Sequence, residues 1–166
     1  DAFCRYAAVM NVLANQDSYA GSGKEHWLYR DTRHGAFHVL PFDLNEVLNS
    51  SVALDPWAGT TSPARPALSG PLQVSEWRER YRAHLRTVVE TSFDPSWLVP
   101  EIQHYHALIA ADVAADLKKL YSTAAFQNNL TGPVTIESGY GPIVMPGLVP
   151  FVQARAAFLS SHPDLV

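Results

Sequence analysis

Two aspartates in this sequence stand where a carboxylate could take part in chemistry. Asp17 follows a predicted helix and opens a glycine-containing loop, and Asp43 comes just after a predicted strand. Reactive groups collect in loops that hang between rigid elements. If the intervening segment folds back as a hairpin, the two carboxylates converge and could hold Mg²⁺, which prefers oxygen ligands and shares them with phosphate. The spacing alone leaves a structural alternative open, with Asp17 in an Asx turn and Asp43 as a helix cap.

Other groupings of reactive residue types are less convincing. Gly23-Lys24 hints at a phosphate-binding loop, but Glu25 stands where that motif requires Ser or Thr. His104 and His106 are two residues apart on a predicted helix, so they point to different faces and make a poor metal pair. No Gly-x-Ser-x-Gly motif of a serine hydrolase is present.

The two aspartates are separated by elements that would position them. Apolar residues recur every three or four positions over residues 2–14, which predicts a helix ending just before Asp17. Residues 21–23 then predict a flexible loop. Two short strands are predicted at 26–30 and 36–40, joined by five residues that end in glycine, which is typical of a hairpin.

The rest of the chain predicts mainly helices. A proline-rich segment at 50–73 reads as irregular surface structure, and helices are predicted to start at a capping Ser75 and at Asp94-Pro95. The second of these keeps its apolar spacing to Leu120. Residues 132–147, rich in glycine and proline, predict a loop, and 149–160 a final helix. We expect Trp97 and Tyr105 to lie in the core.

Length and composition bound the function. The 166 residues fit a single domain, 1–166, with an ordinary share of hydrophobic residues, 47%. A net charge of −4 argues against a nucleic-acid partner. No apolar run approaches the ~20 residues that cross a bilayer. The single cysteine, Cys4, has no partner for an intramolecular disulfide and reads as a small buried hydrophobe.

Several motifs, in the same order along the chain, resemble those of the CotH kinase family (spore coat protein H-like, with an atypical protein-kinase-like fold). Residues 6–19 (YAAVMNVLANQDSY) resemble its helix and catalytic loop, and residues 27–45 resemble its "yyLYrd…g.fhfiPWDlD" signature. Residues 76–81 (EWRERY) are similar to its "eyRerY" helix, and residues 151–159 (FVQARAAFL) to its closing "fv..R..fl".

The resemblance implies an α+β, mainly helical fold: the C-lobe of a kinase with a small antiparallel hairpin. It further implies transfer of a phosphoryl group from ATP, with Mg²⁺ or Mn²⁺, to serine or threonine of a coat or surface protein in bacteria. Asp17 takes the place of the catalytic aspartate and Asp43 that of the metal-binding aspartate, and Glu25 could offer a further oxygen to the metal and nucleotide. The location implied is extracytoplasmic or associated with the spore coat.

This sequence also departs from the family pattern. Lys24, Glu25 and His26 occupy the place where the family usually has an asparagine, and Asn45 replaces its second aspartate. We expect the nucleotide-clamping N-lobe, with its lysine, to be absent from these residues and to be a missing partner from the same parent protein. Because ATP alignment needs that lysine, we expect these residues alone to be weak or inactive. The alternative is a catalytically degenerate module of the same family, kept for adhesion or coat assembly.

Overall fold

The computed structural model describes residues 1–49, 51–139 and 141–166. Its helices, 3₁₀ and π segments are α1 (Ala2–Val12), η1 (Leu44–Glu46), α2 (Pro66–Ser69), η2 (Pro71–Gln73), α3 (Ser75–Thr87), η3 (Val88–Ser92), α4 (Pro95–Ala115), α5 (Thr123–Asn129) and α6 (Leu148–Ser160). Its strands are β1 (His26–Arg30), β2 (Phe37–Pro41), β3 (Val134–Ser138) and β4 (Gly141–Met145). The expectation of an α+β, mainly helical chain with a small antiparallel hairpin is confirmed.

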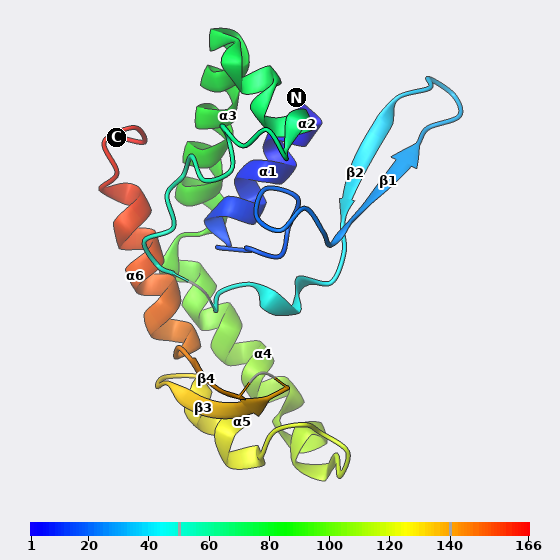
Figure 1. Cartoon of the computed structure of the whole chain (residues 1–166). Helices are drawn as coiled ribbons and strands as arrows, with labels where there is room; N and C mark the ends of the chain where they lie inside the picture. The colour runs from blue at the N-terminus through cyan, green and yellow to red at the C-terminus, as the bar shows by residue number, and fades with distance from the viewer. Residues whose placement is uncertain (50, 140) are drawn as a thin grey trace.

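The core lies where α1 packs against α3 and where α6 reaches the same cluster. In Figure 1 α1 lies beside α3, and α4, α5 and the β3–β4 hairpin are grouped at the other end of the molecule. Ala8 and Val12 of α1, Leu85 of α3 and Leu159 of α6 are completely buried. Burial of apolar surface between these helices holds the end of α1, from which the loop that contains Asp17 (the Asp17 loop) begins.

Helix α1 begins and ends close to the predicted bounds. The sequence predicts residues 2–14, and the helix spans Ala2–Val12. Ala14 adopts a left-handed backbone conformation, with φ of 53°, which a continuing helix cannot contain. The chain therefore turns sharply two residues after the helix and enters the segment that carries Asp17.

The first hairpin is confirmed. Strands β1 and β2 pair antiparallel, with Trp27 opposite Leu40 and Tyr29 opposite His38. The hairpin projects away from the helices (Figure 1), and Trp27, Tyr29 and Phe37 are all more than half exposed. Pro41 is the last residue of β2. A residue without an N–H group is tolerated at a strand end, because it cannot donate to the hydrogen bonds of the sheet.

The prediction of a loop over residues 132–147 is wrong. Strands β3 and β4 form a second antiparallel hairpin there, with Val134 opposite Met145 and Ile136 opposite Ile143. Along β3, partly buried residues alternate with exposed ones, which is the period-two pattern of a half-buried strand. The density of glycine and proline around this short strand obscured that alternation.

Two further details of the helical part differ from the predictions. The helix expected to reach Leu120 ends at Ala115, because Asp116 accepts a hydrogen bond from the N–H of Lys118 and forms a turn. Trp97 and Tyr105, expected in the core, are 43% and 59% exposed. The expected Asp94 cap is confirmed, since its carboxylate accepts from the N–H of Ser96 at 2.8 Å.

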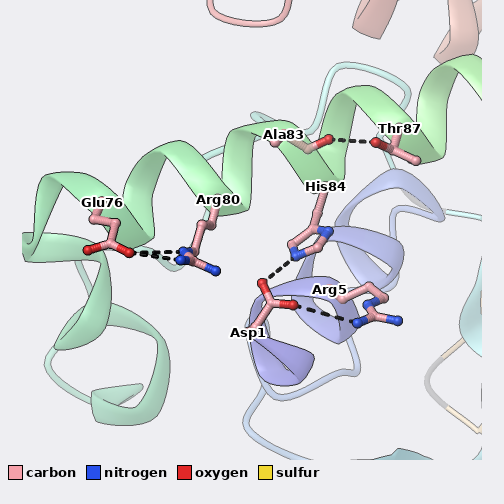
Figure 2. A network of polar contacts seen from close by, with 7 residues as sticks. All are labelled: Asp1, Arg5, Glu76, Arg80, Ala83, His84 and Thr87. Carbon is pink, nitrogen blue, oxygen red and sulfur yellow. Dashed lines mark hydrogen bonds and ion pairs between the residues drawn. The ribbon is translucent and has the colours of Figure 1, made fainter.

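Ser75, predicted to cap a helix, is instead the first residue of α3. The N-cap position is Val74, and no side chain caps this helix. Glu76 and Arg80 form an i,i+4 ion pair of 2.8 Å on the same helix (Figure 2). Such a pair stabilises a helix by about 0.2–0.5 kcal/mol. The helix therefore depends on its own side-chain pairs and on core packing rather than on a serine cap.

Polar contacts join the beginning of α1 to α3. Figure 2 shows His84 pointing at Asp1, with 2.9 Å between the imidazole Nε2 and the carboxylate, while Arg5 approaches the other oxygen at 3.6 Å. Burial, followed by the charge of Arg5, lowers the pKa of His84 below its ordinary value. These contacts fix the relative position of the two helices at the end opposite the Asp17 loop.

Within the described ranges, none of the helices combines the length and apolar character needed to cross a membrane.

Candidate functional site

The loop that carries Asp17 is built on a buried asparagine. Asn15 is 3% exposed, and its side-chain oxygen accepts a hydrogen bond from the backbone N–H of Asp17 at 3.0 Å. The Asx turn considered for Asp17 is therefore made by Asn15 instead. The Asp17 carboxylate is not used to hold its own turn.

The Asp17 carboxylate is partly exposed and has two polar neighbours. Its Oδ1 accepts the hydroxyl of Ser22 at 2.6 Å and lies 3.8 Å from the ammonium of Lys24. The side chain of Asp17 is 32% exposed and that of Lys24 67%. A partly exposed carboxylate that accepts a hydrogen bond from a hydroxyl is placed to accept the proton of a hydroxyl that enters the site.

The loop after Asp17, predicted to be flexible from its glycines, contains hydrogen bonds from both backbone and side-chain donors. The N–H of Ser22 donates to the carbonyl of Gln16 at 2.8 Å, and the guanidinium of Arg65 donates to the carbonyl of Gly21. A Cβ on Gly21 would overlap the carbonyl oxygen of Gln16. Only glycine fits here, so Gly21 is needed for the shape of the turn.

Asp43 lies on the surface just after β2. Its backbone is left-handed, with φ of 47° and ψ of 73°, and it occupies the N-cap position of η1. Aspartate tolerates this conformation better than most residues. Asp43 thus stands at a helix-cap position, as the structural alternative expects. Its carboxylate, however, makes no capping hydrogen bond with η1.

A backbone hydrogen bond joins the two loops. The N–H of Phe42 donates to the carbonyl of Glu25 at 3.3 Å, which places the residue before Asp43 against the residue after Lys24. Since Lys24 is paired with Asp17, the Asp17 loop, Glu25 and the Asp43 loop are linked in one neighbourhood. Glu25 also has a left-handed backbone, with φ of 50°, so the chain bends sharply at this junction.

The metal-ligand set in this neighbourhood is small. Over residues 1–49, 51–139 and 141–166, no three His, Cys, Asp or Glu residues gather as a metal site would require. Asp43 and Glu25 offer oxygen atoms, and Asn45 stands where a second aspartate would add charge. Mg²⁺ commonly takes only one or two carboxylates from the protein and completes its shell with water and phosphate oxygens. The residues present fit that mode of binding.

Arg155 is the residue of greatest structural importance that sequence reasoning did not single out. Its guanidinium, fully buried, donates to the carbonyl oxygens of Asn11 at 2.9 Å, Val52 at 3.0 Å and Leu54 at 2.6 Å. Burial lowers the pKa of Arg155 to about 10, so it remains a cation at neutral pH. The sequence signal that could have pointed to Arg155 is its place as the arginine of the motif at residues 151–159.

Comparison with known proteins decides the family. Residues 1–158 match the CotH kinase protein family, which covers nearly the whole chain. The chain belongs to the CotH kinase family. Neither a curated protein nor a solved structure shows a significant match to it.

Membership in the CotH family gives the site a kinase-like context. ATP and a divalent metal are what such a family uses in general. In the folded chain, the ion pair of Asp17 with Lys24 and the hydrogen bond from Phe42 to Glu25 link the loops that carry Asp17 and Asp43. Their individual roles are taken up as a proposal.

Proposed function

We propose that this CotH-family chain carries the catalytic-loop side of a protein kinase site. Asp17 would act as the catalytic aspartate and Asp43 as a metal ligand, with Glu25 beside it. The observation that supports this most is the junction of Glu25 and Phe42, which joins the loops of the two aspartates. Phosphoryl transfer asks for positioned carboxylates, and the Asp17 loop starts from the buried helix α1.

In the proposed reaction, the hydroxyl of a serine or threonine in an acceptor protein attacks the γ-phosphorus of ATP. Its proton passes to the carboxylate of Asp17, a new O–P bond forms, and the bond to the bridging oxygen breaks to release ADP. Asp43 and Glu25 would hold Mg²⁺ or Mn²⁺, which supplies neutralisation of phosphate charge when bound. The hydroxyl of Ser22, 2.6 Å from Asp17, occupies a position of the kind that an acceptor hydroxyl would take.

We propose that the site works together with a nucleotide-clamping lobe in the parent protein. Kinase chemistry needs a lysine that aligns the phosphates. Lys24 is engaged with Asp17 at 3.8 Å and is a poor candidate for that role. By themselves these residues would then bind nucleotide weakly. Coat or surface proteins outside the cytoplasm are the substrates that we propose for the intact kinase.

A second candidate function is a degenerate family module for adhesion or coat assembly. It is favoured by Asn45 in place of an aspartate and by the apolar residues that the first hairpin exposes, such as Trp27 and Phe37. Exposed apolar patches mark interaction surfaces. This candidate predicts binding to a protein partner without any dependence on Asp17.

Transfer of labelled phosphate from ATP to a serine-rich acceptor protein, catalysed by the parent protein, separates the two candidates. We expect Asp17→Asn to lower kcat by a factor of about 10² or more, the usual contribution of a positioned acid or base. Asp112→Asn, an exposed carboxylate on α4, is the matched control and should leave the rate unchanged. Equal rates in both variants would remove Asp17 from the reaction.

A further inference from the structure

A pocket of about 620 Å³ opens immediately beyond the Asp43 loop. One wall is η1, through Asn45 and Glu46, and the opposite wall is the β3–β4 hairpin. Helices α4 and α5 close the remainder, in the lower part of the molecule in Figure 1. Cavities of this size are typical of sites that enclose an organic group.

The floor of the pocket is apolar. It is formed by aliphatic, thioether and aromatic side chains from α5, the second hairpin and the start of α6, including Phe126, Ile136, Ile143, Met145 and Leu148. The imidazole of His106 lies flat on the ring of Phe126, with 4.1 Å between the ring centroids, and forms part of the same wall. An apolar side chain of a ligand would pack well against this surface.

The charge of the lining excludes a phosphate ligand. Among the described lining residues, Glu46 is the charged one, and no lysine or arginine faces the pocket. A phosphate or nucleotide would therefore meet a negative rim without a cation to pair with. A neutral or cationic group fits, and an anion does not.

The pocket is close to Asp43 along the chain. Asp43 is the N-cap of η1, and Glu46 is the last residue of that helix. At a rise of about 2 Å per residue, a 3₁₀ segment of this length separates the two by roughly 6 Å. An extended peptide covers about 3.3 Å per residue. In the proposed site the acceptor hydroxyl meets Asp17 and the metal-bound phosphate meets Asp43, so a peptide that passes the Asp43 loop would place a nearby side chain over the pocket.

We infer that this pocket is a specificity pocket for the acceptor polypeptide: it takes an apolar side chain a few residues from the phosphorylated hydroxyl, with a basic residue next to Glu46. The inference rests on the proposed function for the choice of occupant. Charge complementarity with Glu46 and continuity with the Asp43 loop argue for a cationic, partly apolar peptide as that occupant.

The test is a methyl NMR titration of the full chain with short capped peptides, without ATP. The probe Gly-Ser-Ala-Leu-Lys-Gly, which puts the lysine beside the leucine and thus near Glu46, should shift the methyl signals of Ile136, Ile143 and Met145. Replacing its leucine by alanine should weaken binding about tenfold, since a buried leucine side chain contributes far more than a methyl group. Replacing its lysine by glutamate should weaken binding further.

Two variants make the test specific. Ala125→Trp, which fills the pocket from α5, should abolish the shifts, and Glu46→Gln should remove the preference for lysine over glutamate. Glu137→Gln, an exposed carboxylate on β3 outside the pocket, is the control and should change neither. Because Glu46 is exposed, its variant keeps the test valid even if Ala125→Trp fails to fold.

The outcomes separate this inference from the proposed function. Peptide binding in the pocket combined with no phosphoryl transfer would uphold the pocket and contradict the kinase site. Equal affinity for the leucine and alanine peptides, or shifts confined to other surfaces, would overturn the pocket even in an active kinase. Shifts of the pocket methyls caused by inorganic phosphate alone would also overturn it.

Discussion

The buried guanidinium of Arg155 donates to the carbonyl oxygen of Asn11 at 2.9 Å, and this contact connects α6 to the end of α1 across the core. The same guanidinium donates to the carbonyls of Val52 and Leu54, so it also fixes the segment after the Asp43 loop. Arg155 thus joins the end of α1, which precedes the Asp17 loop, to residues 52–54, which follow the Asp43 loop. Its effect on function is indirect, through the backbone that it holds.

Arg155→Met should destabilise the chain by about 3 kcal/mol or more, because several buried carbonyl oxygens would lose their donor together. Urea unfolding at pH 7 measures the change. The unfolding free energy of Arg30→Met, at an exposed arginine of β1, should stay within about 0.5 kcal/mol of that of the unsubstituted chain. Equal stability of the two variants would mean that the buried hydrogen bonds contribute nothing net.

Tyr81→Phe tests a second buried contact near the same segment. The hydroxyl of Tyr81 donates to the carbonyl of Pro56 at 2.9 Å, and burial raises the pKa of this hydroxyl above its ordinary value. Its loss should cost about 1–2 kcal/mol of unfolding free energy, since the carbonyl would be left buried without a donor. The control Tyr105→Phe, on an exposed ring, should be nearly neutral in the same unfolding measurement.

Gly21→Ala should disturb the Asp17 loop directly. An added Cβ would overlap the carbonyl oxygen of Gln16, a backbone atom that cannot move without the loop. We expect a loss of about 1–3 kcal/mol in stability and a changed NMR spectrum around Asp17. At Gly139 a Cβ would meet nothing within 4 Å, so Gly139→Ala should be tolerated. An unchanged spectrum in Gly21→Ala would show that the loop is looser than described.

The pH dependence of stability should contain a contribution from His84. Its pKa is lowered in the folded chain, first by burial and then by the charge of Arg5, so the unfolded chain takes up a proton at higher pH. Stability should therefore fall as the pH drops below about 6.5, the ordinary histidine value. In His84→Gln the loss of folding stability between pH 7.5 and 5.5 should be smaller than in the unsubstituted chain. His104→Gln should behave like the unsubstituted chain.

The sequence predicted the first hairpin because several signals agreed there. Strand-forming residues flanked a five-residue connection ending in Gly35, and Pro41 closed the second strand. In the second hairpin the signals conflicted, and glycines and prolines outweighed the alternation of Val134 and Ile136. Short strands among such residues depend on packing against α5, which local sequence does not reveal.

The contacts that support the proposed site could not be predicted from the sequence. Family motifs indicated Asp17 and Asp43, whereas the junction between their loops is a backbone contact that no residue type announces. The partners of Arg155 lie more than 100 residues away along the chain, at Asn11, Val52 and Leu54. Its hydrogen-bond partners could be found only in the folded structure.

The most direct test of the proposed site is a paramagnetic relaxation measurement with Mn²⁺ and ATP. Mn²⁺ broadens the NMR signals of nuclei near it, and the effect is detectable even for weak binding. Our account predicts that the amide signals of Asp17, Glu25 and Asp43 broaden together, and that Asp43→Asn abolishes the effect while Asp112→Asn preserves it. Broadening at Asp43 that leaves Asp17 untouched, or that survives Asp43→Asn, would contradict a shared metal-nucleotide site.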